Sequence, residues 1–193
     1  MKAINEAIRI FAVASLALFS GQSANAQSIS EREDRQAEAA ELLEELARED
    51  LPTWQSVENK LHRNWSRSGS ATADMLLERA RELIEQEKYQ VALEHLTALT
   101  DHAPEFAEGW HLRATVFFNL EEYALAVSDI FTALSLNPHH YEALIGLGII
   151  QEEMGNTDRA LLAFEKAQEI NPHRDQINQA IERLRLNLGR STL

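Results

Sequence analysis

The sequence has no cysteine, few glycines and prolines, and a shortage of positive charge. Without cysteine the chain has no disulfide framework, no thiolate metal site and no cysteine nucleophile. Only 7 glycines and 4 prolines occur in 193 residues, while alanine, leucine, glutamate and arginine are abundant. This composition favours long helices over short strands joined by turns, and it argues against an all-β sandwich.

Acidic residues outnumber basic ones by 31 to 18, which gives a formal net charge of -13. No basic cluster offsets this charge, so a phosphate backbone or an anionic bilayer would be repelled. We therefore expect no nucleic-acid partner. The hydrophobic fraction of 45% is large enough for a packed core, which excludes a disordered chain.

The first 26 residues have the order of a secretory signal peptide. Lys2 and Arg9 precede an apolar run from Ile10 to Phe19, and small and polar residues then lead to Ala24-Asn25-Ala26. The run covers only about half of a ~30 Å hydrocarbon core, so an uncleaved membrane anchor is the weaker alternative. We expect residues 1–26 to be removed and the mature protein to be exported to the periplasm of a Gram-negative bacterium, with no stable membrane insertion.

Three prolines, Pro104, Pro138 and Pro172, follow one another at intervals of 34 residues. A frame with proline at position 32 defines the units 73–106, 107–140 and 141–174. Small residues recur at positions 8 and 20, where the two helices of a hairpin must cross closely. The residues in these two columns are Ala80, Ala114 and Gly148, and Ala92, Ala126 and Ala160.

This pattern resembles the tetratricopeptide repeat, with a large residue at position 4, small residues at 8 and 20, aromatic residues at 17 and 24, and proline at 32. Thr157 departs from it at position 17. The resemblance implies an all-α, right-handed solenoid of three helical hairpins with a concave face. The string from Trp65 to Ser70 is also similar to exported alphaproteobacterial repeat proteins of uncharacterised role.

The ends of a solenoid need covers, and both flanks supply candidates. Residues 27–71 are predicted to form an acidic helical hairpin with helices at 37–47 and 53–65. Moving the frame back puts Leu46 at position 8 and Glu58 at position 20, which breaks the small-residue rule and favours a cap over a fourth repeat. Residues 72–174 hold the three repeats, with Thr72 as the N-cap. Residues 175–193 are predicted to form a capping helix and tail.

No motif for catalysis stands out. The chain has no His-Glu-x-x-His string, phosphate-binding loop or Gly-x-Ser-x-Gly elbow. His139, His140 and His173 follow the repeat prolines, which favours solvated loop histidines over a metal site. We expect no catalytic residue, no cofactor and no metal, and the protein is not predicted to be an enzyme.

The resemblance assigns positions 2, 5, 6, 9, 12 and 13 of each repeat to the concave groove. The partner-binding candidates in and beside these columns are Leu77, Arg81, Glu108, His111, Thr115, Phe118, Asn119, Glu142, Ile145, Ile149 and Glu152. The floor is partly apolar and its surround acidic, which favours a basic or amphipathic segment. The lysine and asparagine positions of the family's carboxylate clamp are not filled. The alternative is that these apolar residues contact neighbouring helices or the N-terminal hairpin.

The sequence therefore predicts a non-catalytic adaptor or scaffold of the bacterial cell envelope that binds a peptide or helix of a protein partner. Two alternatives stay open: a self-associating structural scaffold, and an accessory subunit of an envelope enzyme or export complex. Oligomeric state and partner identity are not predicted, because a repeat scaffold by itself does not specify function.

Overall fold

The computed structural model describes residues 30–191. The chain divides into two units, residues 1–38 and 39–193, and in the first unit the described residues are helical. The predicted signal peptide, residues 1–26, lies outside the described residues. Within residues 30–191 no helix is both long enough and apolar enough to cross a bilayer.

The N-terminal hairpin consists of a helix at residues 30–46 and α2 (Trp54–Trp65). The first helix is already present at Ser30, before the predicted start at 37. Residues 30–36 are rich in glutamate and arginine, which are good helix formers, but they carry no apolar periodicity to reveal it. In α2 the apolar face buries Val57 and Leu61, and Glu58 is buried with them.

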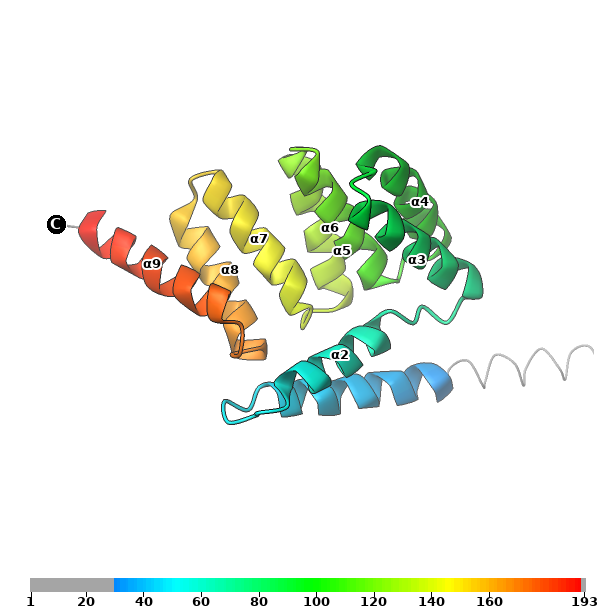
Figure 1. The fold of residues 1–193 in the computed structure, drawn as a ribbon, viewed down its shortest axis with the longest axis horizontal. Helices are drawn as coiled ribbons and strands as arrows, with labels where there is room; N and C mark the ends of the chain where they lie inside the picture. The colour runs from blue at the N-terminus through cyan, green and yellow to red at the C-terminus, as the bar shows by residue number, and fades with distance from the viewer. Residues whose placement is uncertain (1–29, 192–193) are drawn as a thin grey trace, which may run out of the picture. The chain divides into compact units, whose positions relative to one another are not determined.

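Each repeat is a pair of helices. The pairs are α3 (Ala71–Glu85) with α4 (Tyr89–His102), α5 (Ala107–Asn119) with α6 (Tyr123–Leu136), and α7 (Tyr141–Glu153) with α8 (Thr157–Ile170). Figure 1 shows these hairpins in a row, with α9 (Asp175–Ser191) beside α8. Every helix pair that is adjacent along this row packs closely. The predicted all-α solenoid is confirmed for the described residues.

The two small-residue columns lie at the helix crossings. Ala80, Ala92, Ala126 and Ala160 have no exposed surface, and Gly148 lies directly against the ring of Phe164. The third hairpin continues into the C-terminal helix, because Phe164 shares a buried cluster with Ile181 and Leu184 of α9. The capping helix therefore covers the apolar face that the last hairpin would otherwise expose.

The turn inside each hairpin has the same backbone conformation. Position 15 has positive φ in all three repeats: 57° at Glu87, 62° at Glu121 and 74° at Gly155. The following amide then bonds back across the end of the first helix, as in Asn156 N–H to Gln151 O at 2.8 Å. Glycine meets this requirement without strain only in the third repeat, so the turn is set by the hairpin and not by the residue.

The first repeat helix begins two residues earlier than expected, so the prediction of Thr72 as N-cap is wrong. The N-cap is Ser70, whose hydroxyl accepts from the Ala73 amide at 3.4 Å. Asp74 takes part in the same turn, accepting from the Ser68 amide at 2.8 Å. Two residues therefore fix the connection between the N-terminal hairpin and the repeats, and both are bonded locally.

Candidate partner-binding surface

The N-terminal hairpin and the third repeat share one hydrophobic core. Its buried members come from the helix at residues 30–46, the turn after it, α2, α7 and α8: Leu42, Leu46, Leu51, Val57, Leu61, Tyr141, Leu144 and Ala167. The polar and aromatic contacts of α2 with the repeats fall on the start of α7, on His140 just before it and on the loop after α8. This end of the groove is therefore covered by the chain's own helix.

Glu58 of α2 is held by three donors from the repeats, all directed at its Oε1 atom. The Tyr141 hydroxyl donates at 2.9 Å, the Asn171 Nδ2 at 2.8 Å and the Arg174 Nε at 2.9 Å. Because the Tyr141 hydroxyl donates to Glu58, it accepts from His62 Nε2, 2.6 Å away. We call Tyr141, Asn171 and Arg174 the Glu58 site. It is a receptor for one carboxylate, with a full charge supplied by Arg174.

Burial and the neighbouring carboxylates keep Tyr141 protonated. Burial raises the pKa of the Tyr141 hydroxyl well above its usual range, and the charges of Glu142 and Glu58 raise it further. Burial opposes the charge of Arg174, but Glu58 more than offsets this and raises the pKa of the guanidinium. The Glu58 site therefore keeps both its hydroxyl donor and its positive charge across the whole accessible pH range.

Aromatic rings extend the contact on both sides of Glu58. The Trp54 ring stacks on His173 with centroids 5.5 Å apart, and the Trp65 ring stacks on His140 at 4.9 Å. His173 Nε2 also lies 3.1 Å from the Leu46 carbonyl oxygen. Each tryptophan thus covers one histidine, an arrangement worth about 0.5–1.5 kcal/mol per ring pair beyond the buried area.

A buried ion pair lies next to Trp65. Glu108 accepts from Arg81 Nη2 at 2.6 Å and lies 3.1 Å from His140 Nε2. His140 Nδ1 accepts a hydrogen bond from the Ala143 amide at 3.3 Å. The ring proton is therefore on Nε2 and faces Glu108. Burial alone would raise the pKa of Glu108, but the hydrogen bond from His140 and the charge of Arg81 lower it well below its usual range. Glu108 therefore stays ionised and internally neutralised.

The prediction that His140 is a solvated loop histidine is wrong, because its side chain has no exposed surface. The ring is enclosed by Trp65 from α2 and by His111 from α5, whose ring centroid is 4.4 Å away. Burial lowers the pKa of His111 to about 3, so His111 is neutral near pH 7. His173 is half-buried and His139 is exposed.

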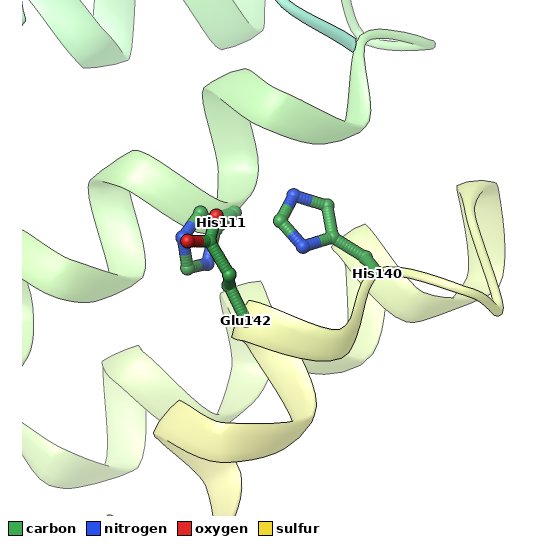
Figure 2. Close-up of side chains that lie close together, drawn as sticks. All are labelled: His111, His140 and Glu142. Carbon is green, nitrogen blue, oxygen red and sulfur yellow. The ribbon is translucent and has the colours of Figure 1, made fainter. Parts of the chain in front are cut away.

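His111, His140 and Glu142 gather between α5 and the start of α7, as Figure 2 shows. One ligand atom from each residue lies within 4.8 Å of the others, and two imidazoles with a carboxylate suit Zn²⁺. Both ring nitrogens of His140, however, already have protein partners in Glu108 and the Ala143 amide. Metal binding through His140 would have to break one of these contacts.

The predicted groove residues at the covered end are occupied within the chain. Leu77 is fully buried in the core of the first repeat, which corrects its assignment to the groove surface. Arg81 and Glu108 pair with each other, and Glu142 lies 3.4 Å from His62 of α2. Ile145 packs against the core shared with the N-terminal hairpin. The alternative interpretation therefore holds for these residues.

The predicted groove residues further along α5 and α7 are more open. Ile149 is 38% exposed, and Phe118 is half-buried, its ring centroid 5.8 Å from that of Tyr123. Thr115 and Asn119 bond to backbone carbonyls of their own helix, so their remaining polar capacity faces outward. Glu152 is bonded to Arg183 of α9. We call the following five residues the open half of the predicted groove: Thr115, Phe118, Asn119, Ile149 and Glu152.

The sequence analysis did not assign Glu58, Tyr141, Asn171 or Arg174 to a site. One signal was available: Glu58 lies among Trp54, Val57, Leu61 and Trp65 on the apolar face of α2, where a carboxylate needs a partner. The partners themselves lie 83, 113 and 116 residues away along the chain. No local pattern could identify them.

Helical hairpins that repeat every 34 residues and pack in a row define an α-helical repeat protein. Family models described as tetratricopeptide repeat match residues 77–135 and 141–174. A TPR repeat-containing protein of Rhizobium etli is 34% identical over 149 residues, which are 75% of this chain and 73% of the relative. The chain belongs to the tetratricopeptide repeat family, and the predicted similarity to alphaproteobacterial members is confirmed.

Three further similar proteins cover a smaller share of this chain. The human protein SGT1 homolog is 30% identical over 104 residues, which are 54% of this chain but 28% of that protein. Among solved structures, the first TPR of Spaghetti (RPAP3) bound to an Hsp90 peptide has a TM-score of 0.60 at 24% identity and covers 62% of this chain and 95% of that one. The Yersinia enterocolitica chaperone SycD in complex with a YopD peptide has a TM-score of 0.58 at 15% identity and covers 61% and 95%. These two likenesses establish the fold alone.

Proposed function

We propose that the protein is a non-catalytic adaptor of the bacterial cell envelope, exported to the periplasm, that binds a peptide or helix of a partner protein in the open half of its groove. The main support for this proposal is that Phe118 and Ile149 are partly exposed apolar residues and lie beside the polar side chains of Thr115 and Asn119. Peptide complexes of the Spaghetti repeat and of SycD support it, because both place a peptide on this fold.

The structure favours an amphipathic partner over a basic one. The acidic residues predicted to attract a basic segment are already paired: Glu108 with Arg81, and Glu152 with Arg183. A paired carboxylate has little charge left to attract a ligand. Affinity would then come from apolar contact with Phe118 and Ile149, and specificity from hydrogen bonds to the polar groups beside them.

Crosslinking in the native envelope, followed by mass spectrometry of the captured proteins, tests this function. Phe118→Ala and Ile149→Ala are each expected to reduce capture at least about fivefold, since truncating a hot spot costs more than about 1 kcal/mol. Phe131→Ala is the matched control, because Phe131 is a 57% exposed aromatic side chain on α6 and is not one of the groove candidates. Capture that responds equally to all three changes would refute binding in the groove.

Export is tested separately by N-terminal sequencing of the protein from its native host. The order of charged, apolar and small residues supports processing after Ala26, so the mature chain is expected to begin at Gln27 and to fractionate with the periplasm. A membrane fraction that retains residues 1–26 would contradict this part of the proposal while leaving groove binding intact.

A further inference from the structure

We infer that α2 is an internal ligand of the repeats, and that the surface beneath it, centred on the Glu58 site, binds a partner helix of the same chemistry by exchange with α2. The partner is an amphipathic helix with one carboxylate in the middle of its apolar face and aromatic residues on both sides. This inference deepens the proposed adaptor function and depends on it, because it assigns the covered half of the groove to the same partner class.

The receptor for the carboxylate belongs entirely to the repeats. Tyr141 begins α7, and Asn171 and Arg174 lie on the loop between α8 and α9. Their donors converge on one oxygen of Glu58 at 2.8 to 2.9 Å. Any carboxylate that reached this point on an equivalent helix would find the same three donors. The site is therefore defined by the repeats and not by the helix that now fills it.

The mode of contact makes α2 replaceable. Successive helices of the repeats pack closely along their backbones, whereas within residues 39–191 α2 has no comparably close backbone packing on any repeat helix. It reaches the repeats through side chains: Glu58, His62 and Trp65 make polar and aromatic contacts, while Val57 and Leu61 enter the shared core. Burying the Glu58 and Arg174 charges carries a desolvation cost that offsets much of their attraction. Desolvation therefore reduces the net contribution of this one ion pair to the docking of α2.

The connection to α3 leaves room for release. Residues 66–70 form a serine- and glycine-rich loop in which Gly69 has φ of 86° and is exposed. This loop is fixed by local bonds of Ser68 and Ser70 to Asp74 and Ala73, and by two bonds to the first repeat, from Arg81 to Ser66 and between Ser70 and His102. α2 can therefore leave without disturbing the first repeat.

The side chains of α2 specify what the surface accepts. Val57 and Leu61 enter the apolar core, Glu58 enters its site, and Trp54 and Trp65 stack on His173 and His140. A synthetic peptide with residues 51–66 of this chain carries the whole pattern and is the probe. In the intact mature protein α2 competes with it at a high effective concentration.

The experiment measures binding of the fluorescently labelled peptide to the full mature chain by anisotropy. Leu61→Asp in the chain places a charge in the shared core and releases α2, so this variant is expected to bind the peptide at least about tenfold more tightly than the wild type. Glu58→Gln in the chain is a second, milder releasing variant and should move affinity in the same direction. Circular dichroism verifies that both variants keep their repeats folded.

Matched controls identify the receptor. Adding Arg174→Gln to the Leu61→Asp chain should weaken peptide binding by about tenfold or more, whereas adding Arg185→Gln, an exposed arginine paired with Glu165, should leave it unchanged. In the peptide, Glu58→Gln should weaken binding and Lys60→Gln, at an exposed position, should not. Equal affinity for the wild type and both releasing variants, or binding that ignores Arg174→Gln, overturns the inference.

The outcomes separate this inference from the proposed function. If envelope capture depends on Phe118 and the peptide does not bind any variant, the adaptor function stands and α2 is a permanent cap. If the peptide binds as expected but capture never depends on Phe118 or Ile149, the covered surface binds helices and the open half of the groove does not.

Discussion

Replacing Gly148 with alanine tests the hairpin packing directly. Gly146, the other glycine near it in α7, supplies a matched control. A Cβ at Gly148 would lie 2.5 Å from Cε1 and 2.6 Å from Cδ1 of Phe164, far inside van der Waals contact. A Cβ at Gly146 would lie 3.6 Å from Ile130 Cδ1, an ordinary contact distance. Both substitutions gain the same ~1 kcal/mol of helix propensity over glycine. Their difference in stability therefore isolates the clash.

The clash is expensive because Phe164 cannot move aside freely. Its ring is 2% exposed and packs with Ile181 and Leu184 of α9, so displacing it disturbs the docking of the capping helix. Overpacking of this kind costs about 1–3 kcal/mol. We expect Gly146→Ala to stabilise the protein by up to ~1 kcal/mol and Gly148→Ala to be about 2 kcal/mol less stable than Gly146→Ala. That difference corresponds to about 4–8 °C in thermal midpoint for a chain of this size.

Urea unfolding followed by circular dichroism measures both variants under one condition. Phe164→Leu removes the atoms that meet the new methyl group, so in a double-mutant cycle it should cost less in the Gly148→Ala chain than in the wild type. If Gly148→Ala is as stable as Gly146→Ala, or if the cycle shows no coupling, then α7 and α8 do not cross at this column. The 34-residue frame would then be misplaced.

Three further predictions concern stability and are measured by the same urea unfolding. Ala160→Leu should cost about 1–3 kcal/mol, because Ala160 is fully buried where two helices cross. Ala107 is half-buried at the start of α5, so Ala107→Leu should cost much less. Equal unfolding midpoints for the two variants would contradict the packing. Arg113→Gln should cost about 3–5 kcal/mol, because it leaves the buried Asp129 carboxylate without the guanidinium that now bonds both of its oxygens. Folding lowers the pKa of His111 to about 3, so between pH 6.5 and 3 the unfolded chain binds a proton that the folded chain does not. The free energy of unfolding should therefore decrease as the pH is lowered through this range, by up to about 1.4 kcal/mol per pH unit. His111→Gln should flatten this slope between pH 6.5 and 5, and an unchanged slope would show that another group is responsible.

The repeats could be predicted from the sequence because each hairpin imposes the same local requirement. Two helices that cross closely need small residues at the crossing, so alanine and glycine recur in columns 8 and 20 whatever surrounds them. The turns could be predicted less well, because Glu87 and Glu121 adopt positive φ without any residue preference to reveal it. In those two repeats the helix packing overrides the local propensity.

The site could be predicted only in part, because half of it is built from contacts across long sequence separations. The groove columns predict Phe118 and Ile149 at a partner surface, and the structure leaves Ile149 38% exposed and Phe118 half-buried. The burial of His140 depends on Trp65, 75 residues earlier, and the role of Glu58 depends on the loop after α8. These contacts belong to the N-terminal hairpin, which has no repeat partner to define its position in sequence.

The net charge was misleading about what the covered surface recognises. A chain with a net charge of -13 is expected to repel a phosphate backbone or an anionic bilayer, yet the Glu58 site holds a carboxylate through Arg174 and Tyr141. Charges separated by more than about 8 Å in solvent are largely screened at physiological ionic strength, whereas donors at hydrogen-bond distance in a buried site are not. Recognition at this surface therefore depends on the few groups within contact distance. Binding of a carboxylate-bearing helix there should consequently respond strongly to Arg174 and weakly to added salt.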